Sequence, residues 1–329
     1  MTTNTVRRSF TAAAALAVAT ALTGAALFAG AAASAQPAPA LTTVNAGFVP
    51  VTDVAAMYLG EEVGIWKKHG LQLKANIAST GAVPAVLSGE YHFGFTALVN
   101  VLQARDKGLP LKIIAAGSSS TGVKGADVTM IHAGPKSGIK SAKDLEGKTV
   151  SVNALNGLLQ MMGKAAVKAD GGDPAKVRFI ELGFPEALAA LQAGKIDAMV
   201  GAEPFGTAAI AAGFPAIASP YQAMSSKSML TSSYFTSEPQ LKANPELFKK
   251  IRAAINESLD YAQQHPDEVR KQLPKFTKLG PDVAAKLILP SYLTQIPREA
   301  VDMFSKSGNE FGMLTKPAAY DVVVWTEGK

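Results

Sequence analysis

The chain has 329 residues, of which 48% are hydrophobic, 18% are charged and none is cysteine. This length predicts two domains or one two-lobed unit, because single hydrophobic cores seldom grow past roughly 250–300 residues. The lack of cysteine excludes disulfides, thiolate nucleophiles, iron–sulfur clusters and a lipid-modified N-terminal cysteine. The net charge of +6 is mild and is not gathered into a basic cluster, so we expect no nucleic-acid partner.

The N-terminus has the three parts of an export signal. Arg7 and Arg8 precede a long uncharged run rich in Ala, Thr, Leu and Val, and small residues close this run at Ala35. The pattern predicts a cleavable signal peptide over 1–35, followed by a Pro/Ala-rich spacer over 36–40. The arginine pair favours the twin-arginine route. A membrane anchor is the alternative, which the high Ala, Thr and Gly content disfavours.

From residue 41 onward, short strand-like runs alternate with amphipathic helical stretches. One of the helices is expected to begin after Thr52 or Asp53 as its N-cap and to end at Gly70. Alternation of this kind is typical of βαβ units with parallel sheets. The predicted strands lie at 41–48, 71–77, 92–95, 111–116, 127–132, 148–152, 177–181 and 196–200, and the helices between them at 54–69, 83–87, 98–107, 157–169 and 185–193.

The C-terminal third changes to successive helices. Each is expected to begin at or near a proline, which suits the first turn of a helix. The four predicted helices lie at 245–264, 266–273, 281–289 and 297–305.

Two Gly/Ser-rich breaks, at 117–125 and 225–233, are interpreted as crossings between two lobes. We therefore predict a first lobe built from residues 41–124 and 225–329, with residues 125–224 inserted as a second α/β lobe.

Enzyme signatures are missing from the sequence. There is no Gly-x-Gly-x-x-Gly after a strand, no Walker loop and no Gly-x-Ser-x-Gly elbow. The four histidines are scattered, without a second ligand at metal-binding spacing: His69, His92, His132 and His265. We expect a protein that is not an enzyme, with no catalytic residue, no metal and no cofactor.

Several predicted strands end in small polar residues that open a helix. Such turns place backbone N–H groups and polar side chains at helix N-termini, and in α/β sheets ligands bind beyond the carboxyl ends of the strands. Each turn could equally be a plain helix cap. Phe205 and Tyr221 could cover a flat ligand, although core packing is the alternative for Phe205. The predicted ligand-binding residues are Thr52, Asp53, Ser79, Thr80, Thr96, Asn153, Asn156, Glu203 and Phe205.

Several dispersed segments resemble the periplasmic solute-binding proteins of ABC importers for sulfonates, taurine, nitrate and thiamine-pyrimidine precursors. The most specific run is Pro-Glu-Ala-Leu-Ala-Ala-Leu-Gln-Ala-Gly-Lys-Ile-Asp-Ala at 185–198, and an acidic-Pro-aromatic motif follows at 203–205. Further matches lie at 57–71, 87–94, 137–148 and 244–247.

The resemblance implies a type II periplasmic binding protein, in which two α/β lobes joined by a hinge close around one ligand. It implies a periplasmic, monomeric receptor that captures a small organic solute (a sulfonate, a taurine-like compound, an aromatic acid or a pyrimidine) and delivers it to permease subunits with their ATPase. The alternatives are an enzyme on the same scaffold related to thiamine-pyrimidine synthesis, which the lack of cysteine disfavours, and a periplasmic ligand sensor.

One departure from the family pattern bears on the ligand. The family often has a tryptophan before the acidic-Pro motif, where this chain has Ala202. A missing indole would enlarge that side of the pocket and disfavour an aliphatic sulfonate. If Asp53 and Glu203 both face the cleft, an amine or an N–H-bearing heterocycle fits better than an anion. If they only cap helices, they do not constrain the ligand.

Overall fold

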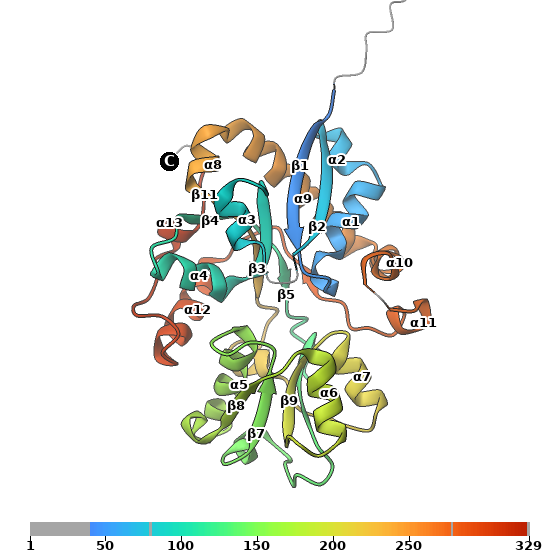
Figure 1. Ribbon diagram of the computed structural model, residues 1–329, viewed down its shortest axis with the longest axis vertical. Coiled ribbons are helices and arrows are strands. Elements are labelled where there is room, and N and C mark those ends of the chain that lie inside the picture. Colours follow the sequence, from blue (N-terminus) through green and yellow to red (C-terminus); the bar gives the residue numbers. More distant parts are fainter. Residues whose placement is uncertain (1–39, 79–80, 278, 328–329) are drawn as a thin grey trace, which may run out of the picture. The chain divides into compact units, whose positions relative to one another are not determined.

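The computed structural model describes residues 40–78, 81–277 and 279–327. The predicted signal peptide over 1–35 lies outside the described residues and stays a prediction. The described residues form a mixed α/β fold with two five-stranded sheets, here called sheet A and sheet B (Figure 1). The predicted α/β class is thus confirmed. No helix in this part of the chain combines the length and the apolar character needed to cross a membrane.

Sheet A contains one strand that runs against the others. β1 is parallel to β2 and to β3, whereas β11 lies antiparallel between β3 and β4. Apolar residues alternate along β1, and those at its buried positions face the core. In spatial order the strands are β2 (Leu71–Ile77), β1 (Thr42–Phe48), β3 (Phe93–Ala97), β11 (Ser232–Ser237) and β4 (Leu111–Ala116).

Sheet B is mixed in the same way. β7 is parallel to β8 and to β9, whereas β6 is antiparallel to β9 and to β10. In spatial order the strands are β10 (Ala216–Ala218), β6 (Thr129–Ala133), β9 (Ala198–Ala202), β7 (Thr149–Val152) and β8 (Arg178–Glu181).

The alternating pattern predicted parallel sheets, and each sheet does contain parallel pairs, but each also contains one strand that runs antiparallel to both of its neighbours. The antiparallel members β6 and β11 are the first strands the chain forms after it passes from one sheet to the other. Such a strand enters its sheet directly from the other one, so it needs none of the helical crossovers that parallel neighbours require.

The two crossing segments pair with each other. Ser120 donates its backbone N–H to the carbonyl of Met229 at 2.9 Å, and Thr231 donates to the carbonyl of Ser118 at 3.0 Å. Ser118 and Ser119 of the first crossing segment form the short strand β5 (Ser118–Ser119), which pairs with β12 (Ser291–Tyr292). The strands of sheet A fall within 41–124 and 225–329, and those of sheet B within 125–224. The division into two lobes at these boundaries stays a prediction.

Helices cover both sheets, and most begin where the sequence places them. α9, α10 and α11 start at the predicted prolines. The helices are α1 (Ala55–Glu62), α2 (Ile65–Lys68), α3 (Val83–Ser88), α4 (Leu98–Asp106), α5 (Leu158–Ala169), α6 (Phe184–Gln192), α7 (Phe205–Ala211), α8 (Glu238–Ala243), α9 (Pro245–Gln264), α10 (Pro266–Phe276), α11 (Pro281–Ala284), α12 (Arg298–Glu310) and α13 (Tyr320–Val323).

Two predicted helices differ from the observed ones. The helix expected over 54–69 is interrupted at Gly64, whose φ of +83° breaks the helical path between α1 and α2. The helix expected over 281–289 stops at Ala284. Pro290 disfavours helical backbone at the residue before it, and the backbone N–H of Ile288 is used by Glu203 (3.3 Å) rather than by a helical carbonyl.

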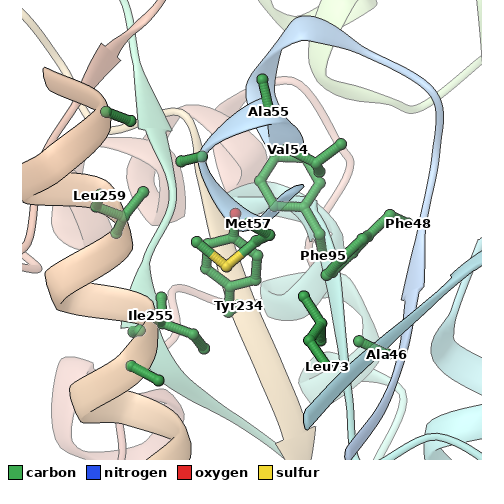
Figure 2. Close-up of a cluster of buried hydrophobic side chains, with 14 of the residues drawn as sticks. Ala46, Phe48, Val54, Ala55, Met57, Leu73, Phe95, Tyr234, Ile255 and Leu259 are labelled. Atoms are coloured by element: carbon green, nitrogen blue, oxygen red, sulfur yellow. The ribbon is translucent and has the colours of Figure 1, made fainter. Parts of the chain in front are cut away.

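The largest hydrophobic cluster joins sheet A to α1 and α9. In Figure 2, Ile255 and Leu259 point from α9 towards Met57 and Tyr234, and Phe48 and Leu73 stand on the neighbouring strands β1 and β2. This packing holds the chain that follows β1, and therefore Asp53, in a fixed place above the sheet.

Gly60 allows the closest approach of α1 to α9. A Cβ atom at this position would lie 2.7 Å from the Cβ of Ser258 and would also overlap its Oγ. We predict that Gly60→Ala lowers the free energy of unfolding by about 1–3 kcal/mol, because a packed interface tolerates no added methyl group. Chemical denaturation measures the change. Gly280→Ala is the control, since nothing lies within 4 Å of the new Cβ. Equal effects of the two substitutions would contradict the prediction.

Candidate functional site

A cavity of about 280 Å³ lies at the carboxyl ends of strands from both sheets. Sheet A contributes residues that follow β1 and that end β3, and sheet B contributes residues that follow β7 and that end β9. The first residues of α5 and α6 complete the wall. This is the position at which parallel α/β sheets bind ligands, and the volume suits a compact solute.

Four of the predicted site residues line this cavity: Asp53, Thr96, Asn153 and Glu203. Three others, Thr52, Asn156 and Phe205, are not among the residues that line it. Ser79 and Thr80 lie outside the described residues, although Gly81, directly after them, is part of the lining.

Thr52 supports the site from behind. Its side chain is buried, its hydroxyl donates to Asp53 Oδ2 at 3.4 Å, and its carbonyl accepts a hydrogen bond from the Tyr292 hydroxyl at 3.1 Å. Thr52 therefore stabilises the turn, and the next residue, Asp53, lines the cavity.

Asn156 uses its backbone and not its amide. Its φ of +57° is left-handed, its N–H donates to Gln160 Oε1 at 2.6 Å, and its carbonyl accepts from Gln103 Nε2 at 2.7 Å. Asparagine is among the few residues that adopt this conformation readily. The residue shapes the loop before α5.

Phe184 lines the cavity, as we had predicted for Phe205. The two rings stack with centroids 5.2 Å apart and an interplanar angle of 13°. Phe184 lines the cavity, and Phe205 packs behind it. Either ring could have been chosen from the sequence, because both open a helix after a strand.

Asp53 contributes a partly buried carboxylate to the site. It was predicted as a helix cap or a ligand contact, and neither it nor Thr52 caps the following helix with its side chain. Its Oδ1 accepts a hydrogen bond from the Ser118 hydroxyl, which also lies 2.7 Å from Ser232 Oγ. Burial raises the pKa of Asp53, and the hydrogen bond from Ser118 opposes that rise.

Glu203 is the corresponding carboxylate at the end of β9. Only 4% of its surface is exposed. It accepts hydrogen bonds from the hydroxyl of Thr207 at 2.7 Å, from the backbone N–H of Thr207 at 3.2 Å and from Ile288 N at 3.3 Å. Burial raises the pKa of Glu203, and these donors lower it in part. The bond to Ile288 ties a sheet B residue to the loop after α11.

The lining also includes residues that sequence reasoning did not select. Phe95 and Ser232 belong to strands of sheet A, and Thr129 belongs to β6. Asn100 donates from Nδ2 to Thr96 Oγ1 at 3.0 Å and so orients that hydroxyl. The i, i+4 spacing of Thr96 and Asn100 is a sequence signal from which this side-chain pair could have been predicted. Tyr221, considered as a ligand cover, does line the cavity.

The cavity wall contains no positive side chain. Among the described residues that line it there is no lysine, arginine or histidine. Within the described ranges, no three His, Asp or Glu side chains come together in a way that could hold a metal ion. The arrangement offers hydroxyl, amide and carboxylate groups around apolar walls, which is a set suited to holding a small molecule by hydrogen bonds and packing.

Comparisons with solved structures identify the fold. The aliphatic sulphonate binding protein SsuA from Escherichia coli aligns with a TM-score of 0.70 at 18% identity, covering 87% of this chain and 94% of that one. The nitrate-binding protein NrtA from Synechocystis PCC 6803 aligns at 0.69 and 16%, covering 87% and 85%. The CA3427 gene product of Candida albicans, described as having the generic periplasmic binding protein fold, aligns at 0.64 and 13%, covering 88% and 99%.

The chain therefore has the periplasmic binding protein fold that its sequence predicted. The family model described as NMT1/THI5 like matches residues 51–269, and the chain belongs to this family. None of the curated proteins matches the sequence.

The partly buried carboxylate of Asp53 makes stability depend on pH. A raised pKa means that the folded state holds the proton more tightly than the unfolded chain, so the carboxyl group destabilises the fold increasingly as pH rises above the unfolded pKa, and the full cost is reached above the folded pKa. We predict that Asp53→Asn raises the melting temperature at pH 7.5. The gain should shrink as pH falls towards the ordinary aspartate value of about 3.9, where the unfolded chain is protonated too.

Asp144→Asn is the control, for which we expect the opposite change in melting temperature. Asp144 Oδ2 accepts backbone N–H groups of Lys140 and Ser141 at 2.9 Å each, and these bonds lower its pKa. Its removal should lower the melting temperature at pH 7.5, with less effect in acid. Differential scanning fluorimetry across pH 3.5–8 measures both variants. A gain for Asp53→Asn that persists undiminished at low pH would contradict the assignment.

Proposed function

We propose that this protein is the substrate-binding component of an ABC import system, which captures a small organic solute and delivers it to membrane permease subunits with their ATPase. One observation carries the proposal: a compact cavity has its walls built from strand ends of both sheets, so that a solute held there contacts both. The fold supports the same function, since a protein of this fold from Staphylococcus aureus is named as the ligand-binding component of an ABC-type import system, and SsuA is named as a periplasmic binding protein.

The protein acts in the periplasm as a monomer that is not lipid-anchored. The signal-peptide pattern over 1–35, its arginine pair and the absence of cysteine support this location. The protein is a receptor and not an enzyme. In support, the described lining offers no histidine, cysteine or lysine, the side chains that most often serve as nucleophile or base in a pocket.

Binding closes sheet A and sheet B on the solute. The paired crossing segments at Ser118–Ser120 and 229–232 act as the hinge, because they alone join the strands of one sheet to those of the other. Polar contacts away from the hinge hold the closed form: Gln103 Nε2 with the Asn156 carbonyl, and Lys164 Nζ with the Phe311 carbonyl at 3.3 Å. A solute that contacts both sheets shifts the population towards this form.

Phe184 tests the position of the binding site. We predict that Phe184→Ala weakens solute binding at least about tenfold, because the ring supplies apolar wall area that the solute would cover. The solute is first identified by mass spectrometry of the extract released from the denatured purified protein, and calorimetric titration then gives the affinity.

Ile210→Ala is the matched control for this variant. Ile210 is an apolar residue of α7 that is 52% exposed and lies outside the lining. Its truncation should leave the affinity within twofold of the parent. Unchanged affinity in Phe184→Ala would show that the solute binds elsewhere.

A further inference from the structure

Asp53, which is partly buried, and Glu203, which is buried, place one carboxylate on each side of the cavity. Asp53 follows β1 of sheet A, and Glu203 follows the last residue of β9 of sheet B. In the part of the chain that the structure describes, every ion pair involves other acidic residues, and neither of these two has a Lys, Arg or His partner within 4.0 Å.

Hydrogen bonds alone offset the burial of these two groups. Asp53 has the hydroxyls of Ser118 and Thr52, and Glu203 has Thr207 and the N–H of Ile288. All of these donors are neutral. A carboxylate that is removed from water loses much of its hydration free energy, and such groups are almost always paired with a cation or a metal. Two of them belong to the same cavity, and none of the described residues that line it is a cation.

The remaining wall favours an organic body. Phe95 of β3 and Phe184, the first residue of α6, provide aromatic surface, and Leu158 and Val51 add aliphatic surface. Aromatic faces attract cations through their quadrupole. Both the carboxylates and the rings therefore favour the same charge, and they repel an anion such as a sulfonate or a nitrate.

We propose that the solute bound in this cavity is a compact organic cation, a primary ammonium or an amidinium on a small apolar body, which forms ion pairs with Asp53 and Glu203 and packs between Phe95 and Phe184. The inference rests on the proposed function and specifies its ligand class. Because the two carboxylates belong to different sheets, a single cationic group attracted to both also draws the sheets together.

Matched probes that differ in charge test this inference. Benzylamine and benzamidine are titrated against benzyl alcohol, benzoate and benzenesulfonate, with butylamine and acetamidine set against 1-butanol and butyrate as the aliphatic series. All use the purified exported protein and calorimetry. We expect at least one cation to bind at least about tenfold more tightly than its neutral and anionic counterparts, since a desolvated charge pair is worth more than one neutral hydrogen bond.

Substitutions of the two carboxylates then test whether they bind the cation. Asp53→Asn and Glu203→Gln should each weaken binding of that cation at least about tenfold. Asp127→Asn is the control. Asp127 is buried, with 1% of its surface exposed; it directly precedes Val128, which lines the cavity, but is not itself part of the lining. It should change the affinity by less than threefold. Because Asp53→Asn is expected to stabilise the fold, a loss of binding in that variant cannot arise from unfolding.

The outcomes separate this inference from the proposed function. A neutral or anionic probe, or a neutral or anionic co-purified solute, that binds more tightly than every cation and is lost in Phe184→Ala would overturn the cation assignment and leave the receptor function standing. Cation binding that survives both carboxylate substitutions would also overturn it. If no probe binds and no solute co-purifies, the receptor function fails, and the ligand assignment fails with it.

Discussion

The hydroxyl of Ser118 connects the parts of the molecule on which the site depends. It donates to Asp53 after β1 and lies 2.7 Å from Ser232 Oγ at the start of β11, while the Ser118 carbonyl accepts the Thr231 N–H at 3.0 Å. The segment that leaves sheet A and the segment that returns to it are therefore joined at one point. The same contacts orient the Asp53 carboxylate at the cavity. Ser232, one member of this contact, also lines the cavity, so the junction of the two segments borders the candidate site.

Two carboxylates of the cavity wall, Asp53 and Glu203, have no counter-ion among the described residues, which indicates a compromise between stability and binding. Burial raises the pKa of Asp53 and of Glu203, which means that each costs folding free energy when it is ionised at neutral pH. Residues of this kind persist at functional sites because their loss would remove an interaction with a ligand. The cation that we propose as the ligand would supply the missing partner and would stabilise the folded state by mass action.

Proteins that share this fold can bind different ligands, because substitutions at the site change the ligand without changing the fold. SsuA and NrtA, named for a sulphonate and for nitrate, share the backbone arrangement of this protein at 18% and 16% identity. Function resides in the site rather than in the fold. In this chain the described lining of the cavity includes Asp53, Glu203 and Ala202 and no basic residue.

The sequence alone determined the elements and the class of protein, because alternating apolar residues, prolines at helix starts and ordered family motifs are local signals. It also identified Asp53, Thr96, Asn153 and Glu203 as residues at strand ends, and all four line the cavity. Only the tertiary structure decided that β6 and β11 run antiparallel, that Phe184 and not Phe205 faces the cavity, and that Thr52 turns inward. These outcomes depend on strand order and on which side of a turn packs against the core, and both arise from contacts between residues far apart in the chain.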